Sequence, residues 1–216
     1  MGETMMSRVA ADKPIIGIAG GIGAGKSFVA RLFEELGALV ISSDDQVRDV
    51  YELPQVKQRL REWWGESVFL ASGKINRRAI AGKVFSDPQQ RRKLEKLIHP
   101  LVAQARDRVM TAHQSDQKVN AFIWDTPLLF ETGLNEACDA VVFVDAPFAE
   151  RAKRVKEQRQ WDPQELARRE NSQWPLDKKR EIADYVICNT ADAELTRVQV
   201  KDVLSRILSK VTPQQS

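Results

Sequence analysis

Short apolar runs divide the chain into predicted strands and helices. An isoleucine-rich run at residues 14–20 ends in glycine, as is typical of a buried parallel strand. Residues 26–36 then repeat apolar side chains at helical spacing, and Gly37 follows as a helix stop. A second apolar run at 38–41 predicts another strand. The order strand, helix, strand indicates a right-handed parallel unit.

Three later apolar runs, at residues 121–124, 140–144 and 185–188, complete a predicted five-stranded parallel sheet. A polar residue follows each run: Asp125, Asp145 and Asn189. Ligands of open parallel sheets bind outside the carboxyl ends of the strands, so these residues are predicted to face one site. The pattern predicts an α/β three-layer sandwich. Its core comprises residues 14–50, 119–150 and 181–210, with a last helix at 193–208.

About 75 residues with a helical pattern separate the second and third strands, far more than a simple crossover needs. We expect a helical insertion at residues 51–118. Within it, Asp87 before Pro88 predicts a helix N-cap, with Gln90 as its capping-box partner. Because proline removes a donor and crowds the preceding turn, Pro100 predicts a kink or break near His99.

Composition limits the classes of function. The 216 residues are 43% hydrophobic, enough for a sizeable core, and 33 basic against 30 acidic residues leave a net charge of +3. This balance predicts neither a nucleic-acid binder nor a membrane binder. The first thirteen residues hold no signal-peptide pattern, which predicts a cytoplasmic protein. Cys138 and Cys188 lie in or beside apolar runs, and both are expected to be buried thiols.

Residues 20–27 read Gly-Gly-Ile-Gly-Ala-Gly-Lys-Ser and fit the phosphate-loop (P-loop) pattern GxxxxGK[ST], between a predicted strand and a predicted helix. The glycines let backbone N–H groups surround phosphate oxygens, and the helix adds its positive N-terminal end. Lys26 is predicted to reach the outer phosphates and Ser27 to ligate Mg²⁺. A glycine-rich turn without ligand is the alternative, but a chance match is on the order of one percent. The sequence therefore predicts a P-loop NTPase fold that binds ATP.

A P-loop alone does not name the reaction. The chain lacks the NKxD segment with which a switch GTPase reads guanine, so a GTPase is disfavoured. Asp44 follows the second strand, where a carboxylate would deprotonate an attacking hydroxyl. The alternative for Asp44 is an N-cap of a helix that begins near Gln46.

Residues 151–180 hold ten Lys or Arg against five acidic residues, which predicts a basic lid. A solvated helix face is the ordinary alternative for such a charge run. Arginine matches phosphate oxygens with a planar fork, and Arg154 is the leading candidate to stabilise the transferred group, with Arg159 second. His99 remains open between a site residue and a structural histidine at a helix break.

Four segments carry a resemblance to the dephospho-CoA kinase family over residues 16–208: GIAGGIGAGKS, GKINRRAIAGKVFSDP, LIHPLV and TPLLFETGL. The resemblance implies a kinase of the nucleoside monophosphate kinase type that phosphorylates the ribose 3'-hydroxyl of dephospho-CoA with ATP and Mg²⁺. It implies Asp44 as catalytic base and Lys26 and Arg154 as catalytic cations. It further implies an acceptor pocket lined by Asp44, Arg77, His99, Pro127, Leu128, Leu129 and Glu131, within the segment 127–131.

The predicted nucleotide contacts are Gly21, Gly23, Ala24, Gly25, Lys26, Ser27, Phe28 and Asn189. Two of the chain's residues depart from the family's pattern. Ser42 replaces the first aspartate of a D-x-D segment, so Asp125 is expected to carry more of the Mg²⁺ ligation beside Ser27. Phe28 replaces a threonine and still offers its backbone N–H.

Two rival functions remain at this point. Another small-molecule kinase of the nucleoside monophosphate type would share the core and the lid, and the HP and PLLFETG segments argue against it. A sensor that binds ATP and transfers nothing would leave Asp44 and the lid arginines idle. We expect a monomer or weak homo-oligomer whose partners are ATP and dephospho-CoA.

Overall fold

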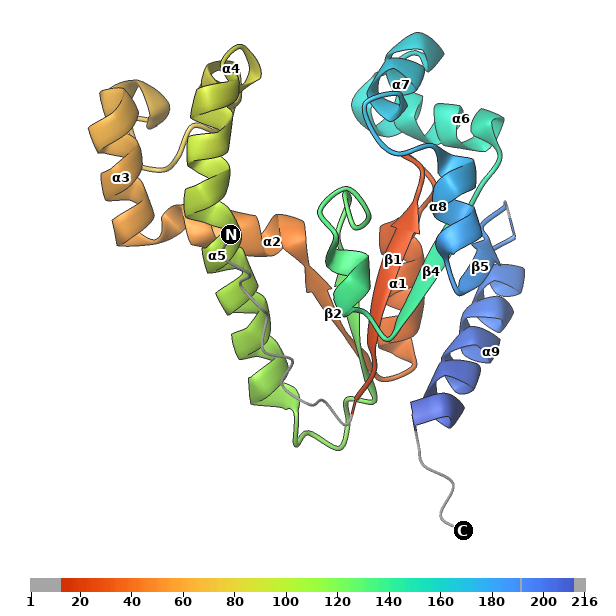
Figure 1. The fold of residues 1–216 in the computed structure, drawn as a ribbon. Helices are drawn as coiled ribbons and strands as arrows, with labels where there is room; N and C mark the ends of the chain where they lie inside the picture. Colours follow the sequence, from red (N-terminus) through yellow and green to blue (C-terminus); the bar gives the residue numbers. More distant parts are fainter. Residues whose placement is uncertain (1–12, 191, 212–216) are drawn as a thin grey trace. The chain divides into compact units, whose positions relative to one another are not determined.

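Five strands form one sheet in the computed structural model, which describes residues 13–190 and 192–211 (Figure 1). The strand order is β2-β3-β1-β4-β5. The strands are β1 (Ile15–Gly20), β2 (Ala38–Ser42), β3 (Ala121–Asp125), β4 (Ala140–Asp145) and β5 (Tyr185–Cys188). β1 pairs in parallel with β3 and β4, and β4 pairs in parallel with β5. The predicted α/β fold with a five-stranded parallel sheet is confirmed.

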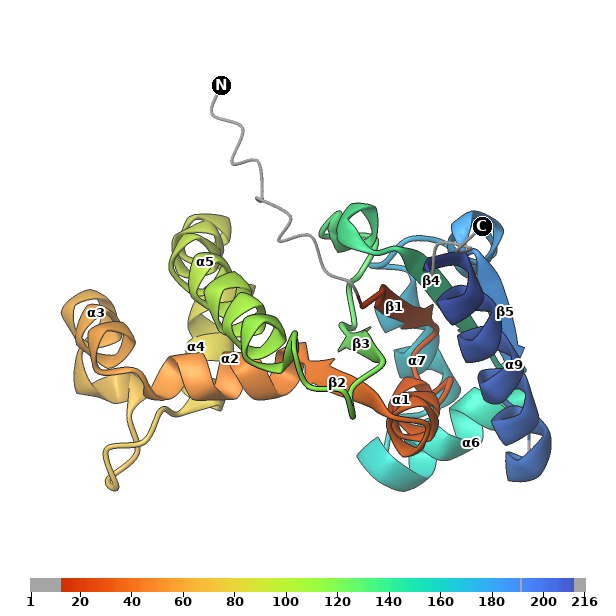
Figure 2. The same cartoon turned by 90° about the horizontal axis from the view of Figure 1, so that it is seen from below.

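Both faces of the sheet are covered. Helices α1 (Lys26–Glu35) and α9 (Ala193–Val211) pack on one face and against each other (Figure 2). The loop after β3, which includes the 3-10 turn η2 (Leu134–Ala137), covers the other face together with α8 (Leu176–Ile182). Because successive strand residues point to opposite faces, Ile18 joins the first cluster and Ala19 the second. Burial on both sides explains the uninterrupted apolar runs of the sequence.

The described chain divides into two compact units. The first holds the sheet and comprises the residues up to Ile41 and from His113 onward; its α6 (Phe148–Arg159) and α7 (Pro163–Glu170) fall in the expected lid segment. The second is Ser42–Ala112. Its helical elements are α2 (Ser43–Glu52), α3 (Pro54–Trp64), η1 (Gly65–Val68), α4 (Arg77–Phe85) and most of α5 (Pro88–His113). They share a core that includes Val56, Leu60, Leu94 and Ile98.

Helix α5 is unbroken from Pro88 to His113, with Pro100 inside it, so the expected break near His99 is wrong. Proline at position 100 leaves the carbonyl of Lys96 without its helical N–H partner. Both residues lie on the exposed side of the helix, and the apolar stripe on its other side keeps its packing. His99 is exposed on this continuous helix and is no buried structural histidine.

The helix caps exclude the alternative reading of Asp44 and the predicted capping-box contact of Gln90. Ser42 caps α2, and its Oγ accepts the N–H of Asp45 at 3.3 Å; Asp44 lies inside the first turn and is not the cap. The serine hydroxyl competes well for this position because its short side chain reaches the free N–H groups. Asp87 does cap α5, but the Gln90 side chain instead accepts the indole N–H of Trp64 at 2.9 Å.

The two cysteines differ in exposure. Cys138 is half-buried and packs against the second sheet cluster. Cys188 is exposed, so its expected burial is wrong. It is the last residue of β5, and its side chain points to the opposite face of the sheet from that of Ile187, which is buried. The expectations for residues 1–12 lie outside the described residues.

Candidate functional site

The phosphate loop connects β1 to α1 and depends on glycines at two close approaches. Gly25 has φ +91° and stands at the N-terminus of α1. A Cβ there would lie 2.1 Å from Nδ2 of Asn189, and one at Gly23, where φ is +76°, would lie 2.7 Å from Cγ2 of Val155. Only glycine combines the positive φ with the missing Cβ. The free N–H groups of the first turn of α1 form an anion-binding end.

Lys26 is the first residue of α1, and its ammonium group lies against the loop. Nζ donates to the carbonyl oxygens of Gly20 and Gly21, each at 3.1 Å. Burial lowers the pKa of Lys26 to about 8; Asp125 opposes the change, and the positive charges of Lys179 and Arg159 add to it. The charged form therefore still predominates at pH 7, by about ten to one. A phosphate anion in this place would be met by a partly desolvated cation, which interacts with it more strongly than a hydrated one.

Ser27 and Asp125 form a pair of oxygen donors beside the loop. The Ser27 hydroxyl, on the first turn of α1, donates to Oδ2 of Asp125 at 3.0 Å. Asp125 ends β3, and its pairing with β1 places it beside Ile18. Hydroxyl and carboxylate oxygens suit Mg²⁺, which takes few protein ligands and completes its shell with phosphate oxygens and water. The described residues include no cluster of three or more His, Cys, Asp or Glu able to hold a metal.

Arg154 and Asn189 approach the loop from α6 and from the end of β5. The Arg154 guanidinium donates to the carbonyl oxygens of Ala24 and Asn189, both at 3.2 Å, and of Gly23 at 3.4 Å. Asn189 is buried, and its Nδ2 donates to the carbonyl of Ala24 at 2.7 Å. The structure thus brings two more of the residues singled out from sequence to the phosphate loop.

Two residues at this site, Arg151 and Glu170, were noted from the sequence only as members of a charge run. Glu170, at the end of α7, accepts the backbone N–H of Ile22 at 3.0 Å and an N–H of Arg151. The side chain of Arg151 is 7% exposed and that of Glu170 is 14% exposed. No sequence signal marks this pair, because Glu170 lies 148 residues from the loop residue that it contacts.

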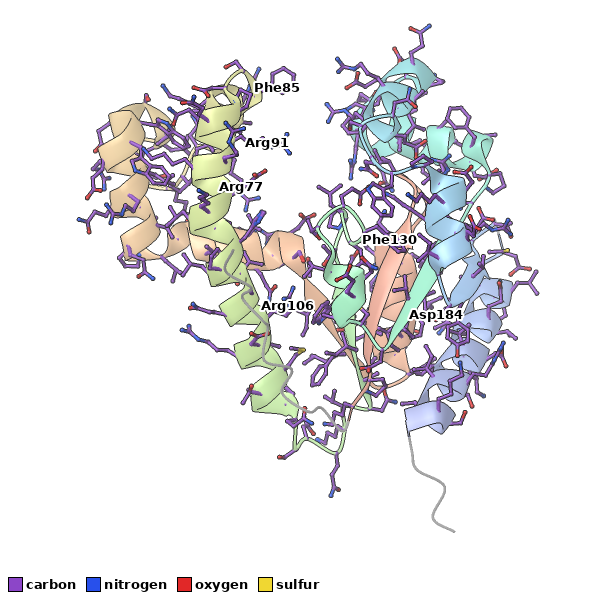
Figure 3. All side chains as sticks on the ribbon, viewed as in Figure 1. Arg77, Phe85, Arg91, Arg106, Phe130 and Asp184 are labelled. Carbon is purple, nitrogen blue, oxygen red and sulfur yellow. The ribbon has the colours of Figure 1, made fainter. Side chains whose placement is uncertain are left out.

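The loop after β3 is held by a second buried charge. Lys179 of α8 is 2% exposed, and its Nζ lies 2.7 Å from Oε1 of Glu131. The same oxygen accepts the backbone N–H of Trp174 at 2.9 Å, and the Trp174 ring stacks on Phe130, which Figure 3 labels. Burial alone would raise the pKa of Glu131, but the hydrogen bonds from Lys179 and Trp174 bring it below its ordinary value. Glu131 is therefore ionised at neutral pH.

The neighbours of Glu131 differ in exposure. Leu129 is 1% exposed and belongs to the second sheet cluster, whereas Leu128 is 41% exposed. Pro127 is exposed as well. The side chains of Pro127 and Leu128 are thus exposed on this loop, while Leu129 and Glu131 anchor it.

The remaining candidate residues belong to the second unit. Asp44 is exposed on the first turn of α2, two residues after the last residue of β2. Arg77, labelled in Figure 3, is exposed at the first position of α4. Its guanidinium lies 5.5 Å from the centre of the Tyr51 ring. His99 is exposed on α5.

The family profile and the curated relatives that match this chain point to one family. A profile of the dephospho-CoA kinase family matches residues 14–194. A dephospho-CoA kinase of Syntrophotalea carbinolica is 38% identical over 90% of this chain and 92% of its own length. One from Corynebacterium glutamicum is 34% identical over 91% of this chain and 98% of its own.

Solved structures agree with the sequence relatives. TT1252 from Thermus thermophilus matches with a TM-score of 0.75 and 32% identity, over 93% of this chain and 98% of that one. Dephospho-CoA kinase from Campylobacter jejuni has a TM-score of 0.67 over 93% of this chain and all of that one. At 21% identity the second comparison shows a shared fold.

Substitution of Gly25 by alanine is expected to weaken ATP binding by about tenfold or more, because the new Cβ collides with the Asn189 amide and the backbone keeps a strained positive φ. Titration calorimetry with ATP measures the affinity. Gly82→Ala is the matched control: its Cβ meets nothing within 4 Å, and on α4 it should raise stability by about 0.5–1 kcal/mol without changing ATP binding. Equal ATP affinity in both variants would contradict the close approach at Gly25.

Substitution of Glu131 by glutamine is expected to lower stability at pH 7 and to flatten its acid dependence. The pKa of Glu131 is lowered in the folded protein, so the stability from its ion pair is complete above the unfolded value of about 4.3 and is lost as pH falls through the lowered pKa. Urea unfolding between pH 7 and pH 3 measures the effect, with the exposed Glu136→Gln as control. If the wild type and Glu131→Gln lose stability in parallel on acidification, the ion pair stabilises nothing.

Proposed function

The chain belongs to the dephospho-CoA kinase family and is a kinase of the last step of coenzyme A biosynthesis, and we propose how its residues transfer the γ-phosphoryl group of ATP to dephospho-CoA. The observation that carries the proposal is the phosphate loop with Lys26, Arg154 and the Ser27–Asp125 pair around it. These residues surround one loop with cations and oxygen donors, as phosphoryl transfer requires.

In the proposed complex, the loop amides and Lys26 hold the β- and γ-phosphates of ATP. Lys26 exchanges its present carbonyl partners for phosphate oxygens, since its Nζ already lies beside the loop. Arg154 contacts the same loop from α6, so a small change of rotamer turns its fork toward the transferred group. Gly21, Gly23, Ala24, Gly25 and Phe28 contribute main-chain contacts, and Asn189 supports the loop at Ala24.

We propose that Ser27 and Asp125 hold Mg²⁺. Their oxygens are 3.0 Å apart and come from two rigid elements, α1 and β3. Bound there with ATP, the cation would neutralise charge on the β- and γ-phosphates. Asp125 supplies the carboxylate of the pair, so the serine at position 42 is free to cap α2.

We propose that Asp44 is the general base. Its carboxylate is exposed and follows the end of β2 directly, where ligands of parallel sheets bind. The ribose 3'-hydroxyl of dephospho-CoA gives its proton to Asp44 as its oxygen attacks the γ-phosphorus. The bond from that phosphorus to the β–γ bridging oxygen breaks, and ADP leaves with the bonding electrons.

For the acceptor we propose Arg77, His99 and the loop that carries Pro127, Leu128, Leu129 and Glu131. Arg77 and His99 are exposed and available to polar groups of the acceptor. Leu128 is one of the large apolar side chains that stay exposed, at 41%, and it suits the pantetheine arm. Lys179 and Trp174 fix the loop through Glu131, so its exposed side chains are presented by a rigid support.

We infer that the enzyme acts in the cytoplasm as a monomer or weak homo-oligomer. The balanced charge of the chain and the small size of its substrates support this. None of the helices in the described residues is long and apolar enough to cross a membrane.

An ADP-release assay with Mg²⁺ and ATP against a panel of acceptors tests the reaction. Dephospho-CoA should give turnover at least about a hundredfold above nucleoside monophosphates, nucleosides and water, because only its remote groups meet the proposed acceptor residues. Turnover confined to a nucleoside monophosphate would overturn the acceptor assignment. ATP binding without any turnover would favour a sensor.

Asp44→Asn should lower kcat by roughly a hundredfold or more and leave ATP affinity nearly intact, because the amide cannot accept the proton. Steady-state kinetics and ATP calorimetry on the same sample separate the two effects. Asp45→Asn is the control, since Asp45 is a neighbouring exposed carboxylate whose surface ion pair with Arg48 contributes little. Unchanged turnover in Asp44→Asn would remove this residue from the mechanism.

A further inference from the structure

A buried ion pair outside the proposed catalytic set lies against the phosphate loop. Arg151 lies in the first turn of α6, and Glu170 is the last residue of α7. Nε of Arg151 also donates to the carbonyl of Ala146 at 3.1 Å, which fixes the guanidinium to the segment after β4. Each residue of the pair therefore also has a backbone partner within the first unit, Ala146 for Arg151 and Ile22 for Glu170.

The two side chains bind the backbone N–H and the backbone carbonyl of one loop residue, Ile22. The N–H of Ile22 donates to Oε1 of Glu170 at 3.0 Å, and the carbonyl of Ile22 accepts from Nη1 of Arg151 at 3.3 Å. The neighbouring Gly21 packs against the same two groups: a Cβ there would lie 2.8 Å from Nη1 of Arg151 and 2.9 Å from Oε1 of Glu170. Glu170 and Arg151 thus fix the two peptide groups on either side of the Ile22 Cα.

The charge of the pair argues against direct phosphate binding. A carboxylate beside a phosphate site repels the ligand unless a cation compensates it. Arg151 does so for Glu170, and the pair as a whole adds no net charge to a site that already holds Lys26, Arg154 and Lys179. Its effect on a nucleotide must therefore pass through the shape of the loop.

We propose that Arg151 and Glu170 are positioning residues for ATP, which fix the Ile22 peptide and so hold the phosphate loop in the form that binds the nucleotide. The proposal rests on the proposed function of the loop as the ATP site. Because α6 and α7 both lie in residues 148–170, the shape of the loop then depends on the docking of the basic segment as well as on β1 and α1. A lid of this kind prepares the site before the nucleotide enters.

Calorimetry with ATP and Mg²⁺ on four variants of the full chain tests the proposal. Glu170→Ala removes the acceptor for the Ile22 N–H and should weaken ATP binding about tenfold or more. Glu170→Gln keeps an oxygen in the same place and should remain within about threefold of the wild type. Glu165→Ala, on the same helix with exposed arginine partners, is the control and should bind ATP as the wild type does.

The fourth variant separates positioning from stability. Arg151→Met with Glu170→Leu replaces a buried ion pair by apolar side chains, an exchange that proteins often tolerate without loss of stability. It should melt near the wild-type temperature yet bind ATP about tenfold more weakly, with the KM for ATP raised and kcat within about threefold. A merely structural pair would show the reverse pattern.

Two results would overturn the proposal. The first is wild-type ATP affinity in the folded double variant, and the second is equal weakening in Glu170→Gln and Glu170→Ala. A wild-type chain that binds no ATP would instead refute the proposed function of the loop. The two failures are therefore distinguishable in one set of titrations.

Discussion

The phosphate loop keeps its form because side-chain donors hold its carbonyl groups. A loop that must offer its N–H groups to an anion needs its carbonyl groups turned away and satisfied. The five carbonyl oxygens from Gly20 to Ala24 all accept from side chains: Gly20 and Gly21 from Lys26, Ile22 from Arg151, Gly23 from Arg154, and Ala24 from Arg154 and Asn189. Four donors from α1, α6 and the end of β5 thus share one task. When Lys26 and Arg154 turn to the phosphates in the proposed complex, Arg151 and Asn189 still hold the carbonyl groups of Ile22 and Ala24.

Two carboxylates of the first unit, Asp125 and Glu170, offset part of the positive charge around this loop. Lys26 is partly desolvated, and Lys179 and Arg159 lower its pKa further, which by itself would favour a neutral amine. Asp125 and Glu170 act in the opposite direction. Asp125 also receives the Ser27 hydroxyl, and Glu170 also receives the Ile22 amide. The same two carboxylates therefore serve charge and geometry together.

Sequence reasoning succeeded where local pattern decides structure. The strands followed from apolar runs that end in polar residues, and the phosphate loop followed from fixed residue types at fixed spacing. It failed where the surroundings decide. Pro100 lies in an unbroken helix, on its exposed side, and Cys188 is exposed at the end of β5, on the opposite face of the sheet from the buried Ile187. Glu170 and Lys179 were visible only as members of a charge run, since a buried charge is recognisable only beside its partner, here 19 and 48 residues away.

The fit between Gly25 and Asn189 joins two positions that are 164 residues apart in the chain. The amide of Asn189 occupies the space that any side chain at position 25 would need. In return, the missing Cβ at position 25 lets that amide reach Ala24. Position 189 is consequently limited to side chains that fit against this glycine, whereas the positive φ keeps position 25 as glycine whichever residue stands at position 189.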